Sequence, residues 1–489
     1  KAITAKSVIN HTPEERIMAF LCDYKRKLNE HDNPIQIPFT RQEIANYTGL
    51  RVETVIRTLS VMKSKNMIII KDRKLFFYMY TINYKYWVKL GLLNFLMVAI
   101  VGFIMRYKIG FSFPFFDQKN LLHAHSHFAF SGWVSHMLMF VITIAISQNI
   151  SSNRIRYYQI CILLNIICAY GMLVGFAVNG YNTFTIIISS ISLFTSITYA
   201  IITLKDLIKN KVITQRLWFI FANCMQIMSS VGTASLVLMM AKHQIEQDRY
   251  LASIYWYLHF QYNGWFFFAC MGLFFAYVKQ QLPQAEIPTA IFNYFAISCI
   301  PAFGLSVLWL NLPILVYITI MLAAICQICG WLWLVLFLKN HKVISIISKK
   351  DLLIKLLFIT IFCATTVKLF LQLFSVIPSI SEMAFGFRPI VIAYLHLVLL
   401  AITSLFLLTY AYARKFINHN IYTKIALILI AAGVLLNECA LGIQGIASLS
   451  YTPVPHIDQI LVIISGILVV GILALLLAQL KFSKQNESI

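Results

Sequence analysis

The sequence predicts a mostly α-helical chain in two unlike parts, a small polar N-terminal domain followed by a transmembrane bundle of twelve helices. The 489 residues are 60% hydrophobic and only 12% charged, about half the charged fraction of soluble proteins. The mean hydropathy is +0.76. Residues 1–78 hold a mixed polar pattern, whereas apolar stretches of roughly 20 residues follow one another from about Trp87 to Leu480. This composition excludes a soluble globule, a disordered chain and a disulfide-rich secreted domain.

We divide the chain into an N-terminal domain (1–78), a linker (79–86), a membrane domain (87–480) and a cytoplasmic tail (481–489). Each apolar stretch of the membrane domain is long enough to cross a hydrocarbon core of ~30 Å. The twelve predicted spans are 87–105, 123–146, 157–177, 181–203, 217–241, 250–277, 287–310, 313–338, 352–377, 389–412, 422–447 and 457–480.

The distribution of Lys and Arg predicts the orientation of these spans. With residues 1–78 in the cytoplasm, the cytoplasmic breaks and the tail carry 17 basic residues and the outer breaks carry six. The outer six are Arg106, Lys108, Lys119, Lys242, Arg249 and Arg388. An excess of this size follows the positive-inside rule. We therefore expect a multi-pass protein of a bacterial-type cytoplasmic (inner) membrane, with the lipid bilayer as a partner. Much of the net charge of +22 then orients the spans and need not bind anything.

The N-terminal domain has the pattern of a winged helix-turn-helix. An amphipathic helix is expected over Pro13–Asn29, and a second helix begins after Thr40, with Glu43 completing a capping box. Gly49 permits a turn before a third helix from about Val52 to Ser64. The apolar runs 67–70 and 75–78, separated by a polar turn, predict a β-hairpin.

This geometry places the helix from Val52 in the major groove of DNA, with its N-terminal half facing the bases. Glu53 can accept a hydrogen bond from a cytosine amino group, and Arg57 can donate to guanine. We expect phosphate contacts from the start of the preceding helix, at Thr40, Arg41 and Gln42.

The stretch TRQEIANYTGLRVETVIRTL closely resembles the helix-turn-helix of the Crp/Fnr transcription regulators, and the resemblance covers about residues 5–78. It implies sequence-specific DNA binding, with a homodimer reading two half-sites. Those regulators carry a cyclic-nucleotide-type β-barrel and a long dimerisation helix upstream of this domain, and this sequence has neither.

Six of the twelve histidines lie in only three predicted spans. His123, His125, His127 and His136 are in the second span, His259 is in the sixth and His396 is in the tenth. The three spans run in the same direction, and most of these histidines lie at a similar depth in the outer half. Ionisable groups in a bilayer are costly, so each is a functional candidate, and a layer of imidazoles suits a haem between neighbouring helices. His136 is expected to be only a hydrogen-bonding residue.

The stretches LLHAHSHFAFSGW, YWYLHFQYNGWFFF and IAYLHLVLLAI in these spans resemble subunit I of the haem–copper oxidases and the related nitric-oxide reductases. In that family, span two carries a low-spin haem ligand, span six a ligand of copper or non-haem iron, and span ten an H-x-H pair. Here His396 matches the second histidine of the pair and Tyr394 replaces the first. The predicted seventh span, IFNYFAISCIPAFG, lacks the family's two histidines.

The resemblance implies a low-spin haem held by His396 and by one of His123, His125 and His127, with Arg388 near the propionates. It also implies copper or non-haem iron at His259. The dinuclear site is incomplete, so an oxidoreductase-like activity is left open. Lys368 and Glu438, deep in spans nine and eleven, are candidates for a proton path, for a propionate partner or for a buried ion pair.

Three hypotheses follow. The first is a haem-binding redox or nitric-oxide-related membrane protein, with an electron donor that the sequence does not identify, fused to a DNA-binding domain. The second is a membrane-tethered transcription regulator whose spans serve as sensor and anchor without catalysis. The third is a fusion of two neighbouring genes, in which Met79 was the start codon of a separate membrane protein.

Overall fold

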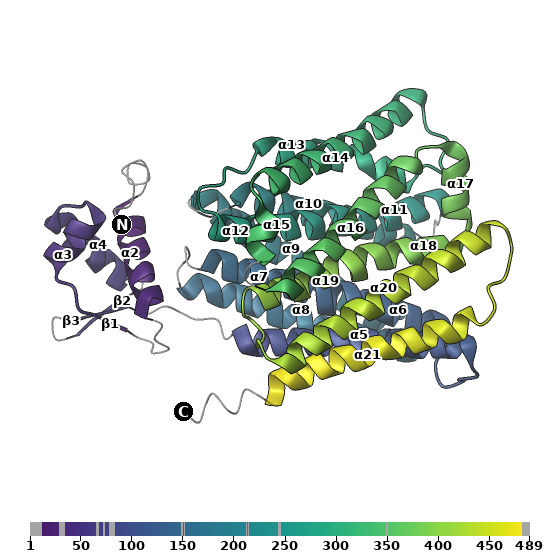
Figure 1. The fold of residues 1–489 in the computed structure, drawn as a ribbon, viewed down its shortest axis with the longest axis horizontal. Helices are drawn as coiled ribbons and strands as arrows, with labels where there is room; N and C mark the ends of the chain where they lie inside the picture. Colours follow the sequence, from purple (N-terminus) through teal and green to yellow (C-terminus); the bar gives the residue numbers. More distant parts are fainter. Residues whose placement is uncertain are drawn as a thin grey trace. The chain divides into compact units, whose positions relative to one another are not determined.

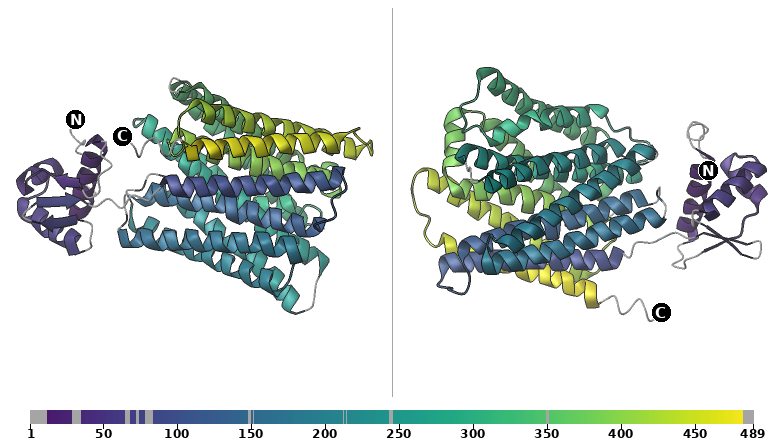
Figure 2. Two further views of the ribbon diagram at one scale, coloured as in Figure 1. Left: turned by 90° about the horizontal axis from the view of Figure 1, so that it is seen from below. Right: turned by 180° about the vertical axis from the view of Figure 1, so that it is seen from behind.

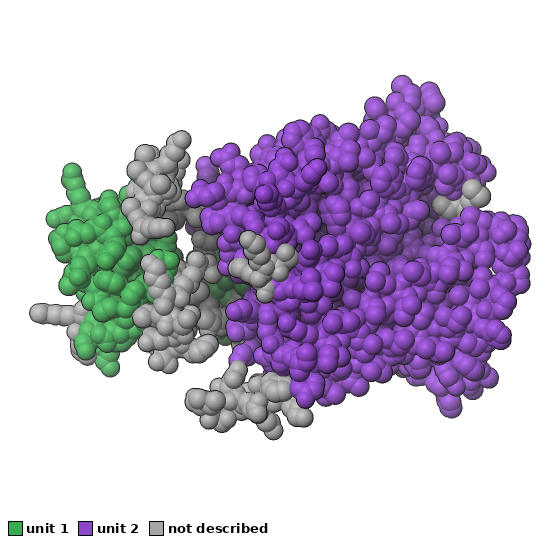
Figure 3. Space-filling view, viewed as in Figure 1, with its two compact units in different colours: residues 1–83, 143–160 green, residues 84–142, 161–489 purple. Residues whose placement is uncertain are grey.

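The computed structural model shows a mostly helical chain that divides into two compact units (Figure 3). One unit comprises residues 1–83 and 143–160, and the other comprises 84–142 and 161–489. The structure describes residues 12–28, 35–64, 68–71, 74–77, 84–147, 150, 152–211, 213, 215–242, 246–348 and 351–481. His11, His31 and His243, most of the predicted linker and residues 482–489 of the predicted tail lie outside these ranges.

The described residues between 12 and 77 form three helices and a small sheet (Figure 1). The helices are α2 (Pro13–Leu28), α3 (Arg41–Thr48) and α4 (Val52–Ser64), and the strands are β1 (Ile35–Ile37), β2 (Ile68–Lys71) and β3 (Lys74–Phe77). The strands pair antiparallel in the order β1-β3-β2. The predicted hairpin is confirmed as β2 and β3, and β1 is an additional strand that the sequence pattern did not indicate.

A capping box and a left-handed glycine define the helix-turn-helix. Thr40 Oγ1 accepts a hydrogen bond from the Glu43 amide at 3.2 Å, and the Glu43 carboxylate accepts one from the Thr40 amide at 2.7 Å. These hydrogen bonds lower the pKa of Glu43. Gly49 ends α3 with φ 65°, a conformation in which a side chain would be strained. The left-handed turn at Gly49 therefore lets α4 begin only a few residues after α3 ends.

One apolar core holds these elements together. The fully buried side chains come from all three helices and from the sheet, so the helices pack on one face of the sheet. They include Ile17, Leu21, Ile44, Val55, Leu59, Met62, Ile68, Leu75 and Phe77. Because each element of the helix-turn-helix contributes to this core, the exposed face of α4 is held in a fixed orientation.

The rest of the chain is a bundle of long apolar helices, shown from two further sides in Figure 2. Ten helical segments of the described residues are long and apolar enough to cross a membrane. They are Tyr84–Gly110 (α5), Gln118–Ser147 (α6, η1, α7), Arg154–Asn179 (in α8), Thr183–Lys209 (α9), Arg216–Met240 (in α10), Ile314–Asn340 (α14), Leu352–Phe374 (α16), Arg388–Ala413 (α18, η4, α19), Ile421–Leu449 (α20) and Ile457–Leu480 (in α21). The predicted series of long apolar helices is therefore confirmed for ten candidate spans, whereas the count of twelve stays a prediction.

The two remaining predicted spans differ from the other ten. The sixth, predicted over 250–277, is a helical segment formed by α11 (Gln247–His259), η2 (Phe260–Phe266) and α12 (Phe267–Gln281). Where the seventh was predicted, over 287–310, α13 (Thr289–Cys299) has only 11 residues and is followed by a 3-10 turn over Pro301–Ser306. A proline cannot donate the next helical hydrogen bond, and 11 residues rise only ~16 Å. The prediction of one long helix over 287–310 is therefore wrong.

Each of the three spans that carry the clustered histidines contains a π-helical segment. The segment η1 (Ala129–Ser135) begins two residues after His127, η2 begins directly after His259, and η4 (Leu397–Ser404) begins directly after His396. π-helical turns widen a helix and are frequent at functional sites. The three histidine positions therefore share a π-helical segment just after the histidine as well as a similar predicted depth.

We predict that Thr40→Ala destabilises the N-terminal unit by about 1 kcal/mol, because the mutation removes the cap of α3. The free energy of unfolding of this unit can be measured in the full-length chain by pulse proteolysis in urea. Gln42→Ala, in the same exposed first turn, is the matched control and should leave the unfolding midpoint within experimental error. Equal stability of Thr40→Ala and the unmutated protein would contradict the role of the capping box.

Candidate functional site

The candidate DNA-reading surface is the exposed face of α4. Glu53 and Arg57 lie one turn apart on this face and are exposed, as predicted for base-contacting side chains. Ile56 lies beside them with 54% of its surface exposed. An exposed isoleucine at this position suits contact with a thymine methyl group. Sequence reasoning missed it because an apolar residue in a helix is usually assigned to the core.

At the start of α3, Thr40 and Gln42 form hydrogen bonds within the protein. The Thr40 hydroxyl is committed to the capping box, where it also donates to the Glu43 carboxylate at 2.9 Å. Gln42 is exposed and donates to Asn46 Oδ1 at 3.1 Å, while Arg41 is half-buried. The amide groups of a helix start still favour a phosphate. The predicted phosphate contacts of these three residues stay predictions.

In the membrane bundle, His123 and His127 share one face of α6 (Gln118–Phe128). The ring of His127 stacks on Phe176 with 4.5 Å between centroids, and His127 Nε2 lies 3.2 Å from the Tyr181 hydroxyl. The His123 ring lies edge-on to Tyr181 at 4.7 Å. Both imidazoles therefore face the end of α8 (Ser152–Asn179) and the turn that follows it.

His125 faces the other way, toward α5. Its ring approaches Gly102 so closely that a Cβ there would lie 3.2 Å from His125 Cε1. His125 lies close enough to His396 and Arg106 for their charges to interact, and its Nδ1 is buried without a hydrogen-bond partner. Among the three histidines of α6 that the sequence left open, His125 is the one whose electrostatic environment includes His396.

His396 ends α18 (Arg388–His396). Its Nδ1 lies 2.8 Å from the carbonyl oxygen of Ile392. Because a carbonyl can only accept, Nδ1 carries the proton and Nε2 keeps its lone pair. Metal-ligating histidines are usually held by such a hydrogen bond through the second ring nitrogen. The donor chemistry of His396 and His125 thus fits axial ligation of a haem iron.

Arg106 is a site residue that sequence reasoning assigned only to orientation. Its guanidinium lies close enough to His125, His396 and Asp458 for their charges to interact. Arg388, which the resemblance placed near haem propionates, is exposed at the start of α18. The sequence offered one signal for Arg106, because a basic residue in the last turn of an otherwise apolar span is costly without a partner.

His259 is fully buried, and both of its ring nitrogens have protein partners. Nε2 lies 2.9 Å from the carbonyl oxygen of Cys299, and Nδ1 lies 3.2 Å from Asn263 Nδ2. The described residues contain no group of three or more His, Cys, Asp or Glu side chains able to hold a metal ion. Copper or non-haem iron at His259 stays a prediction that this hydrogen bonding does not support. His136 is buried and bonds through Nε2 to the Trp87 carbonyl at 3.1 Å, as expected of a packing residue.

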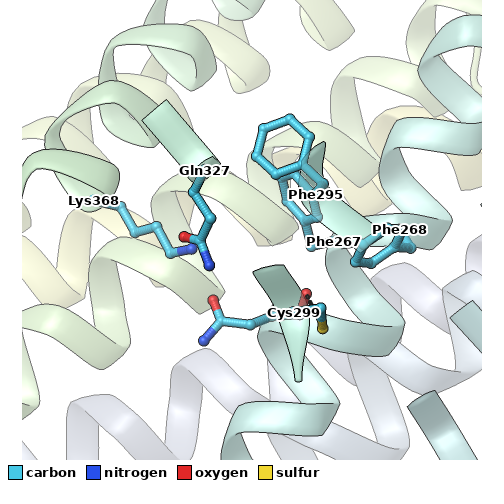
Figure 4. Close-up of a pocket in the computed structure, with 7 residues that line it drawn as sticks. Phe267, Phe268, Phe295, Cys299, Gln327 and Lys368 are labelled. Carbon is cyan, nitrogen blue, oxygen red and sulfur yellow. Dashed lines mark hydrogen bonds between the residues drawn. The ribbon is translucent and has the colours of Figure 1, made fainter. Parts of the chain in front are cut away.

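A small cavity is lined in part by Asn263 and Cys299, the two residues that bond His259 (Figure 4). Its lining includes Lys368, Gln327, Asn263 and Cys299 together with three phenylalanine rings, Phe267, Phe268 and Phe295. The space open to the centre of a water molecule is about 10 Å³, which is roughly enough for one water. Lys368 is only 6% exposed and points into this space, with its Nζ 5.9 Å from the centre of the Phe267 ring.

The polar groups near the cavity do not form an ion pair with Lys368. The charged or polar groups that interact with its ammonium are Cys299 and His259. Glu438, the other buried candidate, accepts a hydrogen bond from its neighbour Asn437 at 3.2 Å in α20. Among the described residues no carboxylate is shown paired with Lys368, so the hypothesis of a buried ion pair is not supported there.

Comparison with known proteins finds matches for the N-terminal helix-turn-helix. Residues 15–77 match the model of the Crp-like helix-turn-helix domain. A stretch of 60 residues is 37% identical to the nitrogen fixation regulation protein FixK of Rhizobium meliloti (strain 1021) and covers 12% of this chain and 28% of that relative. Residues 15–77 form a Crp-like helix-turn-helix domain. The resemblance of the membrane region to haem–copper oxidases stays a prediction.

We predict that Lys368→Met leaves the bundle as stable or stabilises it by up to about 3 kcal/mol, because methionine fills similar space without an ammonium to desolvate. Thermal unfolding of the full-length protein in detergent measures the change. Lys205→Met, at an exposed position of α9, is the matched control and should lie within about 0.5 kcal/mol of the unmutated protein. A large loss of stability would show that the ammonium makes bonds that support the fold.

Proposed function

We propose that this protein is a membrane-integrated transcription regulator that binds DNA in a sequence-specific manner through residues 15–77. The observation that carries the proposal is a complete Crp-like helix-turn-helix, with Glu53 and Arg57 on the open face of α4, in one chain with ten candidate membrane spans. The 17-to-6 distribution of basic residues supports a cytoplasmic position for this domain. The whole protein's signal and partners are part of the proposal, because the matched stretch covers 28% of its relative.

The DNA-binding proposal assigns roles along α4. Arg57 reads guanine through a bidentate contact, Glu53 selects cytosine, and Ile56 contacts a thymine methyl group. Each domain reads one half-site, so a palindromic operator requires two copies of the chain. The membrane supplies proximity: two copies in one bilayer have a high effective concentration at the surface, which favours simultaneous binding of both half-sites.

We predict that Arg57→Ala weakens binding to the selected operator by roughly 5- to 150-fold, equivalent to about 1–3 kcal/mol, and relaxes the base preference at one position of each half-site. The operator is first selected from a random duplex library with the full-length protein in nanodiscs, and affinities are measured at several salt concentrations. Lys63→Ala, at the far end of α4, is the matched control and should lower affinity for all sequences equally, with a shallower salt dependence.

Failure of the full-length protein to enrich any motif would contradict the regulator proposal. So would equal effects of Arg57→Ala and Lys63→Ala on specific and random duplexes.

We propose as a second function that His125 and His396 hold a low-spin haem between spans two and ten. Three observations support it: an electrostatic interaction between the two imidazoles, the His125 Nδ1 atom that has no hydrogen-bond partner and the hydrogen bond from His396 Nδ1. Two imidazoles on one iron suit electron transfer and leave no open position for oxygen. A redox or nitric-oxide-related signal received there is one input by which the membrane region would inform the regulator.

We predict that the protein purified with haem gives sharp α and β absorption bands on reduction, and that His125→Ala and His396→Ala each abolish them. Visible spectra of dithionite-reduced protein in detergent test this. His341→Ala, at an exposed position after α14, is the matched control and should retain the bands. Retention of the bands in both ligand variants, or a featureless spectrum of the unmutated protein, would rule out this haem pair and leave the DNA-binding proposal unaffected.

A further inference from the structure

We propose that His123, His127 and Tyr181 form a binding site for a divalent transition-metal ion of the Cu²⁺ or Zn²⁺ type, separate from the His125–His396 pair. The site lies at the end of the bundle where α6 begins and α8 ends. It rests on neither the haem nor the DNA-binding proposal. Its basis is the arrangement of three rings that the structure brings together from two parts of the chain.

The two imidazoles have the spacing of a chelating pair. His123 and His127 are one turn apart on α6, so their rings project from the same face. Both rings contact Phe176, with centroid distances of 6.1 Å and 4.5 Å. His125 between them projects toward α5 and is therefore excluded from the site.

The third ligand comes from the turn between α8 and α9 (Thr183–Lys209). Gly180 has φ 62° and lies so close to α6 that a Cβ there would be 2.4 Å from Asn120 Oδ1. Asn182 caps α9, accepting from the Thr185 amide at 2.9 Å. Tyr181 is thereby held beside both histidines, while 51% of its surface remains exposed. The exposed edge of this ring offers a metal ion a route to the site.

The ligand atoms already have the separation of a coordination shell. His127 Nε2 and the Tyr181 hydroxyl oxygen are 3.2 Å apart. In a tetrahedral zinc site with bonds of ~2.0–2.1 Å, two ligand atoms lie about 3.3 Å apart. His123 Nε2 is buried and has no hydrogen-bond partner, so no protein group competes with a metal ion for it. One water would complete four ligands.

The nearby charges and the ligand types select the class of ion. Asp117, which caps α6, and Lys119 both lie close enough to His123 for their charges to interact, so they largely offset one another. Imidazole and phenol ligands suit Cu²⁺ and Zn²⁺, whereas Ca²⁺ and Mg²⁺ require carboxylate and carbonyl oxygens.

The test uses the full-length protein in detergent, without a polyhistidine tag and stripped with a chelator. Cu²⁺ binding is followed by electron paramagnetic resonance, and Zn²⁺ binding by competition with a chromogenic chelator. We expect one equivalent of either ion and no binding of Mg²⁺. His123→Ala and His127→Ala should each weaken binding at least 10-fold, and Tyr181→Phe should weaken it several-fold.

His341→Ala, at an exposed position after α14, is the control, because it removes a histidine that lies outside both proposed sites and should leave metal affinity unchanged. The Cu²⁺ spectrum of the unmutated protein provides a readout that does not depend on the folding of any variant. Hyperfine coupling to two imidazole nitrogens supports the site. Absence of stoichiometric binding, coupling to fewer than two nitrogens, or equal loss in His341→Ala and His123→Ala would overturn it.

Discussion

The membrane region depends on one constraint: in hydrocarbon, a polar group must find its hydrogen-bond partner within the protein. The π-helical segments illustrate this. In η1, the Ser131 carbonyl accepts from Asn165 Nδ2 at 2.9 Å and the Gly132 carbonyl accepts from Asn94 Nδ2 at 2.6 Å. Trp133 Nε1 of η1 donates to Ser404 Oγ of η4 at 2.8 Å. Side chains from neighbouring helices thus satisfy the widened turns and fasten spans two and ten to each other.

The same constraint sorts the histidines by role. His259 has partners on both nitrogens, and His136 satisfies its N–H on a backbone carbonyl; both are therefore accounted for by packing alone. Ring nitrogens without a hydrogen-bond partner lie in α6, at His123 Nε2 and His125 Nδ1, and also at His136 Nδ1 in α7. The two proposed sites use histidines on opposite sides of α6. The proposed haem pair, His125 and His396, lies on one side, and the proposed metal ligands His123 and His127 lie on the other.

Much of the fold follows from local sequence. Thr40, Glu43 and Gly49 carry the helix-turn-helix because capping and left-handed turns are properties of a few adjacent residues. The apolar length of each stretch locates the spans. The short strand β1, the break at Pro301 and the π-helical segments required tertiary information. Sequence spacing separates His125 from His123 and His127, but only packing against Gly102, Phe176 and Tyr181 shows which face meets which neighbour. Arg106 was missed because its partners lie on three other helices.

The central claim joins a DNA-reading domain to a membrane region, and membranes that carry the protein test it most directly. Inside-out vesicles from cells expressing the full-length chain would be incubated with fragmented genomic DNA, washed and sequenced. The account predicts enrichment of fragments sharing a twofold-related motif, present with inside-out vesicles and absent with right-side-out ones. Retention of DNA without a shared motif, or equal retention by both vesicle orientations, would contradict it.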